Sequence, residues 1–144
     1  MTYEVSKVEV WTREIDDRAG SLAAALEPLA AAGVDLVFMI ARRYTHVKGK
    51  GVVFVGGITG EKATKAAEGA GYKRSGDLAG LRVEGPNTPG DASRVARLLA
   101  QAGINLRGVS ASVIGPRYVQ IMAFDSAADA DKAAGLLRGA GKGK

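Results

Sequence analysis

The stretch Ala102-Gly103-Ile104-Asn105-Leu106 has a close copy, Ala32-Gly33-Val34-Asp35-Leu36, which lies 70 residues earlier in the chain. The same separation relates Asn87-Thr88-Pro89-Gly90 to Asp17-Arg18-Ala19-Gly20. Two different motifs that recur at one spacing indicate an internal repeat. We therefore predict that the chain is a tandem duplication.

Each copy passes through the same order of hydrophobic periodicities. A short alternating strand leads into a helix with one apolar stripe, which ends at Gly33 in the first copy and at Gly103 in the second. Two extended apolar runs and a second amphipathic helix follow. The predicted strands are residues 8–11, 34–41, 52–55 and 72–78 in the first copy, and 81–84, 104–114 and 118–124 in the second.

This βαββαβ order predicts the α+β fold class, with two ferredoxin-like repeats that each form an antiparallel sheet with both helices on one face. The first repeat is expected over residues 1–79 and the second over residues 80–144. The second repeat has no evident last strand, because residues 139–144 contain only Gly, Ala and Lys. We expect residues 2–5, which alternate suitably, to fill the vacant edge of its sheet.

The second and third predicted strands of the first repeat are apolar on both faces. Phe38 and Ile40 alternate with Val37 and Met39, and the run from Val52 to Val55 has no polar residue. Helices cover only one face of such a sheet. We therefore expect the other face or edge to pack on the sister repeat or on another protomer, and the protein to form a homodimer.

The composition excludes several classes of protein. The chain has 144 residues, no cysteine and a formal net charge of +5. Without cysteine there are no disulfides, thiolate metal sites or cysteine nucleophiles. No apolar run is long enough for a signal peptide or a membrane span, so we expect a cytoplasmic protein that does not enter a membrane. The positive charge does not by itself identify a nucleic-acid partner.

The loop motifs and the helix-ending motifs together resemble those of the ACT family, whose small βαββαβ regulatory domains bind amino acids. This resemblance covers nearly the whole chain. It implies a non-catalytic regulatory sensor, an amino acid or similar small zwitterion as its ligand, and an enzyme that it regulates. The ligand-binding residues that it implies are Asp17, Arg18, Ala19, Gly20 and Asp35 in the first repeat, and Asn87, Thr88, Pro89, Gly90 and Asn105 in the second.

The chemistry of these loops suits such a ligand. A helix N-terminus offers unpaired N–H groups to a carboxylate, and an Asp or Asn oxygen accepts from an ammonium group. Gly20 and Gly90 would let the ligand approach closely. The neutral Asn87 and Asn105 suit a zwitterion without adding charge, so the second loop is expected to be the better site.

The same residues also have a purely structural explanation. Thr88, followed by Pro89 and Asp91, is a suitable helix N-cap with proline at the first helical position. Asp35 and Asn105 follow C-capping glycines and are suitable turn residues. The structural and the ligand-binding roles are compatible.

Other functional classes have weaker support. The run Lys50-Gly51-Val52-Val53-Phe54-Val55 resembles part of an RNA-recognition motif, but Phe54 is its only aromatic ring, which disfavours nucleic-acid binding. His46 is the only histidine, and the acidic pairs fit no catalytic or metal pattern, so no enzymatic activity, cofactor or metal is expected. A protein–protein interaction module without a ligand is the main alternative.

Overall fold

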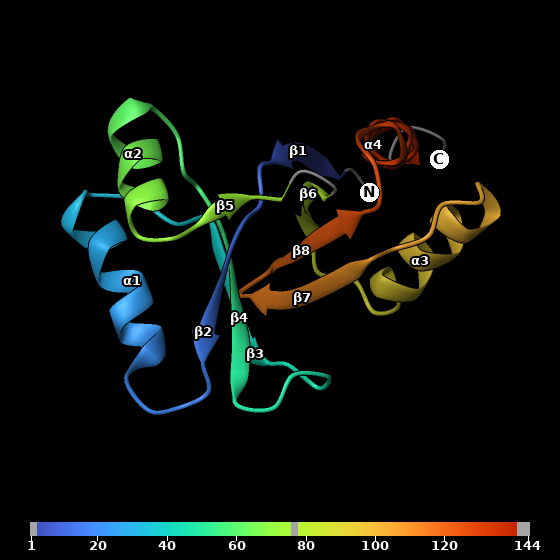
Figure 1. Ribbon diagram of the computed structural model, residues 1–144. Helices are drawn as coiled ribbons and strands as arrows, with labels where there is room; N and C mark the ends of the chain where they lie inside the picture. The colour runs from blue at the N-terminus through green and yellow to red at the C-terminus, as the bar shows by residue number, and fades with distance from the viewer. Residues whose placement is uncertain (1–2, 76–77, 141–144) are drawn as a thin grey trace. The chain divides into compact units, whose positions relative to one another are not determined.

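Two four-stranded antiparallel sheets, each with its own pair of helices, organise the structure (Figure 1). The computed structural model describes residues 3–75 and 78–140. Residues 9–75 form one unit, and the residues before and after them form the other. We call these units the first repeat and the second repeat. The predicted fold class, two ferredoxin-like βαββαβ repeats, is confirmed.

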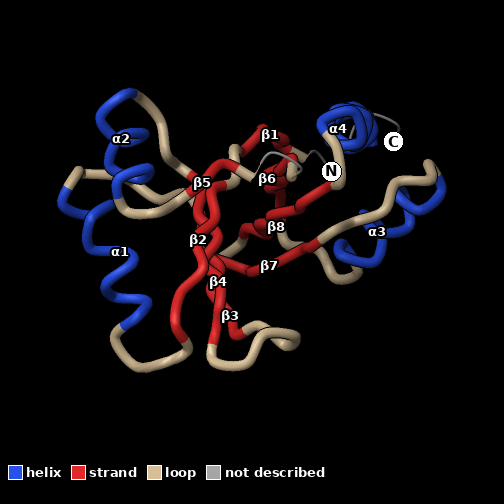
Figure 2. Tube along the Cα trace, viewed as in Figure 1, coloured by secondary structure: helices blue, strands red, loops and turns tan. Residues whose placement is uncertain are grey.

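The first repeat runs through β2 (Trp11–Asp16), α1 (Ser21–Ala31), β3 (Phe38–Arg43), β4 (Lys50–Gly56), α2 (Glu61–Gly69) and β5 (Lys73–Arg74). Its strand order is β3-β4-β2-β5. Both helices lie on one face of the sheet, as Figure 2 shows. Between them and the sheet lies an apolar core of Trp11, Ala25, Leu29, Val53, Val55, Ile58, Ala67 and Tyr72.

The second repeat runs through β6 (Ala79–Pro86), α3 (Asp91–Gln101), β7 (Gly108–Ile114), β8 (Arg117–Phe124) and α4 (Ala127–Ala140). Its sheet has the order β1-β6-β8-β7, so its fourth strand is β1 (Glu4–Val8) from the start of the chain. Its larger core contains Tyr3, Leu81, Val83, Val95, Leu99, Ile104, Met122, Phe124, Ala130, Ala133, Ala134 and Leu137.

The amino-terminal residues complete the second sheet, as expected from the missing last strand. β1 pairs antiparallel with β6, from Glu4 opposite Glu84 to Val8 opposite Gly80. Tyr3 is only 4% exposed and Val5 packs against the same core. Thr2, which was expected to join this strand, lies outside the described residues. The observed division differs from the expected boundary between residues 79 and 80, because residues 3–8 belong to the second repeat.

One predicted strand is wrong, because Val8 and Trp11 lie in different sheets rather than in one short strand. Val8 ends β1, and Trp11 begins β2. The long extended runs are also shorter than expected, since β3 begins only at Phe38 and β7 only at Gly108. The residues before them, such as Val34 and Leu106, still pack against the cores from the preceding loops.

The glycines at the ends of α1 and α3 have the expected capping role. Gly33 and Gly103 have φ angles of 72° and 74°, in the left-handed region that favours glycine. The N–H of Gly33 donates to the Ala30 carbonyl, and that of Val34 donates to the Leu29 carbonyl. This is the Schellman pattern, and the chain after Gly103 repeats it.

The start of α3 differs from the sequence prediction. The N-cap is Gly90 and not Thr88, and Pro89 precedes the helix. Asp91 is the cause, because its Oδ2 accepts the Thr88 N–H at 3.1 Å while its own N–H donates to the Thr88 carbonyl. Gly90 then needs a φ of 87°. No side chain crowds the Cβ position of Gly90, so backbone conformation rather than close approach explains this glycine.

The strand register separates the two apolar faces of the first sheet. Val53 and Val55 belong to the helix-covered core. Because residues paired across strands share a face, the opposite face carries Val52, Phe54, Phe38 and Ile40. Coverage of this face by a partner stays a prediction.

The packing of Tyr3 makes β1 a stabilising part of the second repeat. Tyr3→Ala should lower the free energy of unfolding by about 3–5 kcal/mol, because it empties a buried aromatic position. Ser6→Ala, an exposed change in the same strand, should stay within about 0.5 kcal/mol of wild type. Chemical denaturation measures both values, and equal stability of the two variants would contradict the role given to Tyr3.

Candidate functional site

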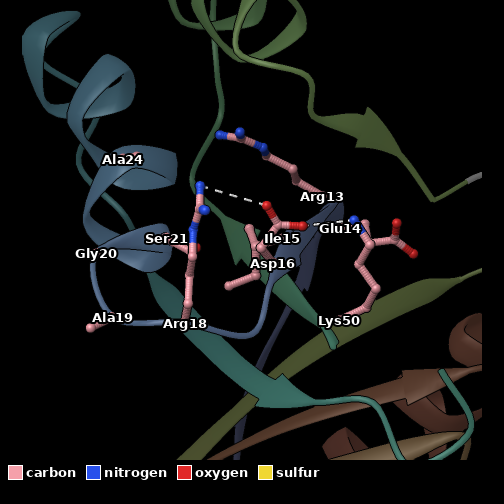
Figure 3. Close-up of a pocket in the computed structure, with 10 residues that line it drawn as sticks. All are labelled: Arg13, Glu14, Ile15, Asp16, Arg18, Ala19, Gly20, Ser21, Ala24 and Lys50. Atoms are coloured by element: carbon pink, nitrogen blue, oxygen red, sulfur yellow. Dashed lines mark hydrogen bonds and ion pairs between the residues drawn. The ribbon is translucent and has the colours of Figure 1, made fainter. Parts of the chain in front are cut away.

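A cavity of about 490 Å³ opens in the first repeat between the end of β2 and the start of α1. It is lined by Arg13, Glu14, Ile15, Asp16, Arg18, Ala19, Gly20, Ser21, Ala24 and Lys50. Figure 3 shows the Arg18 side chain rising beside Asp16, with the Arg13 guanidinium above both. Three of the predicted ligand-binding residues, Arg18, Ala19 and Gly20, therefore line this cavity.

The cavity exists because the fourth strand of the first sheet is short. β5 pairs only with Trp11 and Thr12, whereas β4 pairs with the whole of β2. Residues 13–16 of β2 consequently have a neighbouring strand on one side only. The side chains of Arg13 and Asp16 and the first turn of α1 surround the space that a longer strand would occupy.

Opposite charges meet at the mouth of the cavity. Lys50 Nζ lies 2.7 Å from Asp16 Oδ1, and Arg18 lies 3.7 Å from Asp16 Oδ2. The hydrogen bond from Lys50 and the Lys50 charge lower the pKa of the Asp16 carboxyl, and the same hydrogen bond and the Asp16 charge raise the pKa of the Lys50 ammonium. Both groups therefore stay charged around neutral pH. The site offers cations and carboxylates within one small volume.

Asp17 faces a second, smaller hollow on the other side of the same loop. Its Oδ2 accepts a hydrogen bond from Arg43 Nε at 2.5 Å. This hollow, about 210 Å³ in volume, is also lined by Arg18 and Leu22. Asp17 is thus engaged with β3, and the loop between β2 and α1 separates the two hollows.

The equivalent place in the second repeat is filled by the chain itself. Asp91 stands where the first repeat has Ser21, and its carboxylate is only 2% exposed. Besides the Thr88 N–H, it accepts the Tyr3 hydroxyl at 3.1 Å and an ion pair from Arg94. In the first repeat Tyr72, just before the short β5, is also buried, but its hydroxyl donates to the Ala25 carbonyl and not to the start of α1.

Tyr118 belongs to the same buried polar cluster. It lies opposite Gly85 in the register, where the first repeat has only Gly51 opposite Ile15. Its hydroxyl donates to Gln120 Oε1 at 2.9 Å. Burial raises the pKa of the Tyr118 hydroxyl, and the charge of Asp91 adds to this; burial likewise raises the pKa of Tyr3. Both hydroxyls therefore stay protonated and able to donate.

Two predicted site residues lie away from the loops. Asp35 precedes β3, whose first residue Phe38 is opposite Gly56, whereas Asp16 is opposite Lys50 at the other end of β4. Asn105 is likewise at the far end of the second sheet from Asn87. A strand of this length spans about 20 Å, so neither residue meets the loop of its own repeat.

Residues at the site that the sequence did not indicate come from β2, from β4, from the start of α3 and from the residue before β1. Arg13, Glu14 and Lys50 line the cavity, and Tyr3 and Asp91 fill its counterpart. An unusual Arg at an inward position of β2 was the available signal for the cavity. Nothing local indicates the pairing of Tyr3 with Asp91, which are separated by 88 positions.

The other candidate motifs do not form a second site. His46 lies against the Tyr44 ring, with centroids 4.8 Å apart, in the exposed loop between β3 and β4. Over residues 3–75 and 78–140, no group of three or more His, Asp or Glu residues is arranged to hold a metal ion. No helix in that same part of the chain is long and apolar enough to cross a membrane.

Asp91 and Ser21 give a matched pair of variants. Asp91→Ala should lower the free energy of unfolding by about 1–3 kcal/mol, because the buried Tyr3 hydroxyl and the Thr88 N–H lose their acceptor. Ser21→Ala, at the equivalent position beside the open cavity, should change it by less than about 0.5 kcal/mol. In combination with Tyr3→Phe the loss from Asp91→Ala should shrink. Additive losses in denaturation experiments would contradict the cluster.

Comparison with known proteins identifies the fold. The family model of the ACT domain matches residues 80–140. No curated protein matches the sequence. Among solved structures, a protein from Bacteroides thetaiotaomicron has a TM-score of 0.74 at 16% identity, with 95% of this chain and 90% of that chain covered.

Two further structures are described as regulatory subunits of aspartate kinase. The one from Thermus thermophilus, in a ligand-free form, has a TM-score of 0.66 at 18% identity, and the one from Thermus flavus has 0.64 at 18%. Each alignment covers 97% of both chains. Residues 80–140 therefore match the ACT domain, and residues 9–75 have the same βαββαβ fold, so the resemblance drawn from the loop motifs is confirmed.

Proposed function

We propose that this protein is an amino-acid sensor that regulates an enzyme, and that its ligand site is the cavity between β2 and α1 of the first repeat. The cavity is the observation that carries the proposal. Its volume of about 490 Å³ lies within the range of small-molecule sites. ACT domains as a class, and the aspartate kinase regulatory subunits with this fold, make regulation by an amino acid the natural role for such a site.

The lining matches the two charged ends of an α-amino acid. The carboxylate would be held by Arg18 and by the N–H groups of the first turn of α1, where the helix dipole favours negative charge. The ammonium group would be held by the carboxylates of Glu14 and Asp16. Arg13 is left for the ligand's side chain, which favours a polar or acidic amino acid.

We rank the first repeat above the second, which reverses the order expected from the sequence. In the second repeat the buried Asp91 carboxylate stands at the start of α3, where it accepts the Thr88 N–H and the Tyr3 hydroxyl, and the buried Tyr118 lies nearby. A ligand carboxylate would have to displace a buried, fully paired group there. The loop from Asn87 to Gly90 is then structural, while the loop from Asp17 to Gly20 takes the ligand.

Regulation requires that the ligand bind two conformations unequally. The cavity is bounded on one side by a strand edge and on the other by the start of a helix, so a ligand that bridges them would draw β2 and α1 together. Rigidifying this pair is the change that a regulated enzyme would sense. The expected enzyme is one that uses or makes the bound amino acid.

Isothermal calorimetry with the common amino acids tests this proposal. One of them should bind, and Arg18→Ala should weaken its binding at least tenfold, equivalent to about 1.4 kcal/mol. Thr88→Ala, at the matching position of the second repeat, should leave affinity unchanged. A melting-temperature increase with the same amino acid should accompany binding.

Two results would contradict the proposal. If none of the common amino acids binds, the result would favour an interaction module without a ligand. An affinity lost in Thr88→Ala but kept in Arg18→Ala would instead place the site in the second repeat. Circular dichroism of both variants serves as the control for folding.

A further inference from the structure

An arginine occupies a core-facing position of the first sheet. Arg13 lies opposite Val53 in the pairing of β2 with β4, and Val53 belongs to the helix-covered core. Residues paired across two strands share a face, so the Arg13 side chain starts on the same face as this core. The equivalent residue of the second repeat, 70 positions later, is the fully buried Val83. A charged side chain therefore stands where the sister copy has an apolar one.

A buried aromatic ring supports the Arg13 guanidinium beside the cavity. The guanidinium carbon lies 6.0 Å from the centroid of the Tyr72 ring, which is 2% exposed. The Tyr72 hydroxyl donates to the Ala25 carbonyl of α1 at 2.8 Å, so the ring has a fixed orientation. A contact between a cation and a ring face leaves the N–H groups of the guanidinium able to donate to another group. Arg13 also lines the cavity, so that group can be a ligand.

Arg13 has no carboxylate partner within residues 3–75 and 78–140. The other two cations of the cavity lining do have one, because Asp16 lies 2.7 Å from Lys50 and 3.7 Å from Arg18. Figure 3 draws both of these pairs as dashed lines, and Arg13 stands apart from them. A half-buried guanidinium gains most from an anion that replaces the water it has lost. Arg13 is therefore the cation of the cavity that is available to a ligand anion.

The charges of the cavity lining leave an excess of one positive charge. Three cations, Arg13, Arg18 and Lys50, face two carboxylates, Glu14 and Asp16. A zwitterion with a neutral side chain would leave this excess in place, and a basic amino acid would increase it. An acidic amino acid carries one net negative charge around neutral pH and would balance it.

The place of Arg13 in β2 suits a second carboxylate on the ligand. Asp16 and Arg18, which are proposed to hold the ammonium and carboxylate ends, lie at the end of β2 and in the following loop. Arg13 is three residues earlier in the extended strand, about 10 Å along its axis. Its long side chain and the one or two methylene groups of an acidic ligand together can bridge this distance.

We propose that the ligand is an acidic amino acid, aspartate or glutamate, and that Arg13 selects it by binding the side-chain carboxylate. This inference rests on the proposed sensor function and names the class of ligand for the same cavity. The contact between arginine and a carboxylate is charge-assisted and bidentate, and a side-chain amide cannot reproduce it. Tyr72 is a positioning residue, because it holds the guanidinium beside the cavity without neutralising it.

Calorimetry with each acid and its amide tests this selectivity. Aspartate and asparagine, like glutamate and glutamine, have nearly the same shape and differ in side-chain charge. Wild-type protein should bind one of the acids at least tenfold more tightly than the corresponding amide. Arg13→Gln should weaken binding of that acid at least tenfold and change the affinity for the amide less than about twofold, which is the signature of a residue that reads the side chain.

Arg74→Gln is the matched control. Arg74 is a second guanidinium stacked on a buried ring of the same sheet, 5.0 Å from the centroid of Trp11, and it does not line the cavity. This change removes the same charge and a similar ring contact, so it should leave the ratio of acid to amide affinity within about twofold of wild type. Arg13→Lys, which keeps the charge but not the bidentate geometry, should retain part of the preference for the acid.

The outcomes separate this inference from the proposed function. Equal weakening of acid and amide binding in Arg13→Gln, with an unchanged melting transition, would overturn it, because a structural role of Arg13 affects both ligands alike. Tightest binding of a neutral or basic amino acid would also overturn it, while the sensor function would stand. If no amino acid binds, the sensor function fails and the inference fails with it.

Discussion

The pairing of β1 with β6 is the interaction that makes the second repeat differ from the first. It gives the second sheet a full fourth strand from the start of the chain, and its extension carries Tyr3 to the first turn of α3. The first sheet has only the two-residue β5 at this place. One sheet edge is therefore closed beside its helix, and the other is left open as a cavity.

Electrostatics at the helix starts follows from that difference. The start of each helix carries unpaired N–H groups that favour a negative charge. In α3 the chain supplies this charge through Asp91. The cost of burying its carboxylate is offset because Tyr3, Thr88 and Arg94 all donate to it. In α1 no acidic residue stands in the first turn. The start of α3 thus meets a carboxylate of the chain itself, whereas the start of α1 is open to an anion from solution.

The sequence predicts those features of the fold that depend on residues close together in the chain. The repeat, the helices and the capping glycines depend on neighbouring residues, and these expectations agree with the structure. The start of α3 differs from the prediction because Asp91 engages both backbone groups of Thr88, and the Tyr3 hydroxyl that also binds Asp91 comes from a position 88 residues away. Asp35 and Asn105 are ligand-binding candidates through motif likeness, which does not show that strand direction places them at the opposite ends of the sheets from the loops.

The edges of the two sheets show a second divergence between the copies. On β3 the outermost positions became Arg42 and Arg43, and Arg43 also holds Asp17 in the loop beside the cavity. The charge that protects this edge therefore also shapes the candidate ligand site. On β7 the matching positions are Ser112 and Val113, which leave the edge uncharged and have no loop carboxylate to bind. The two edge strands therefore differ in charge and in their contact with the preceding loop, although they occupy the same place in the repeated fold.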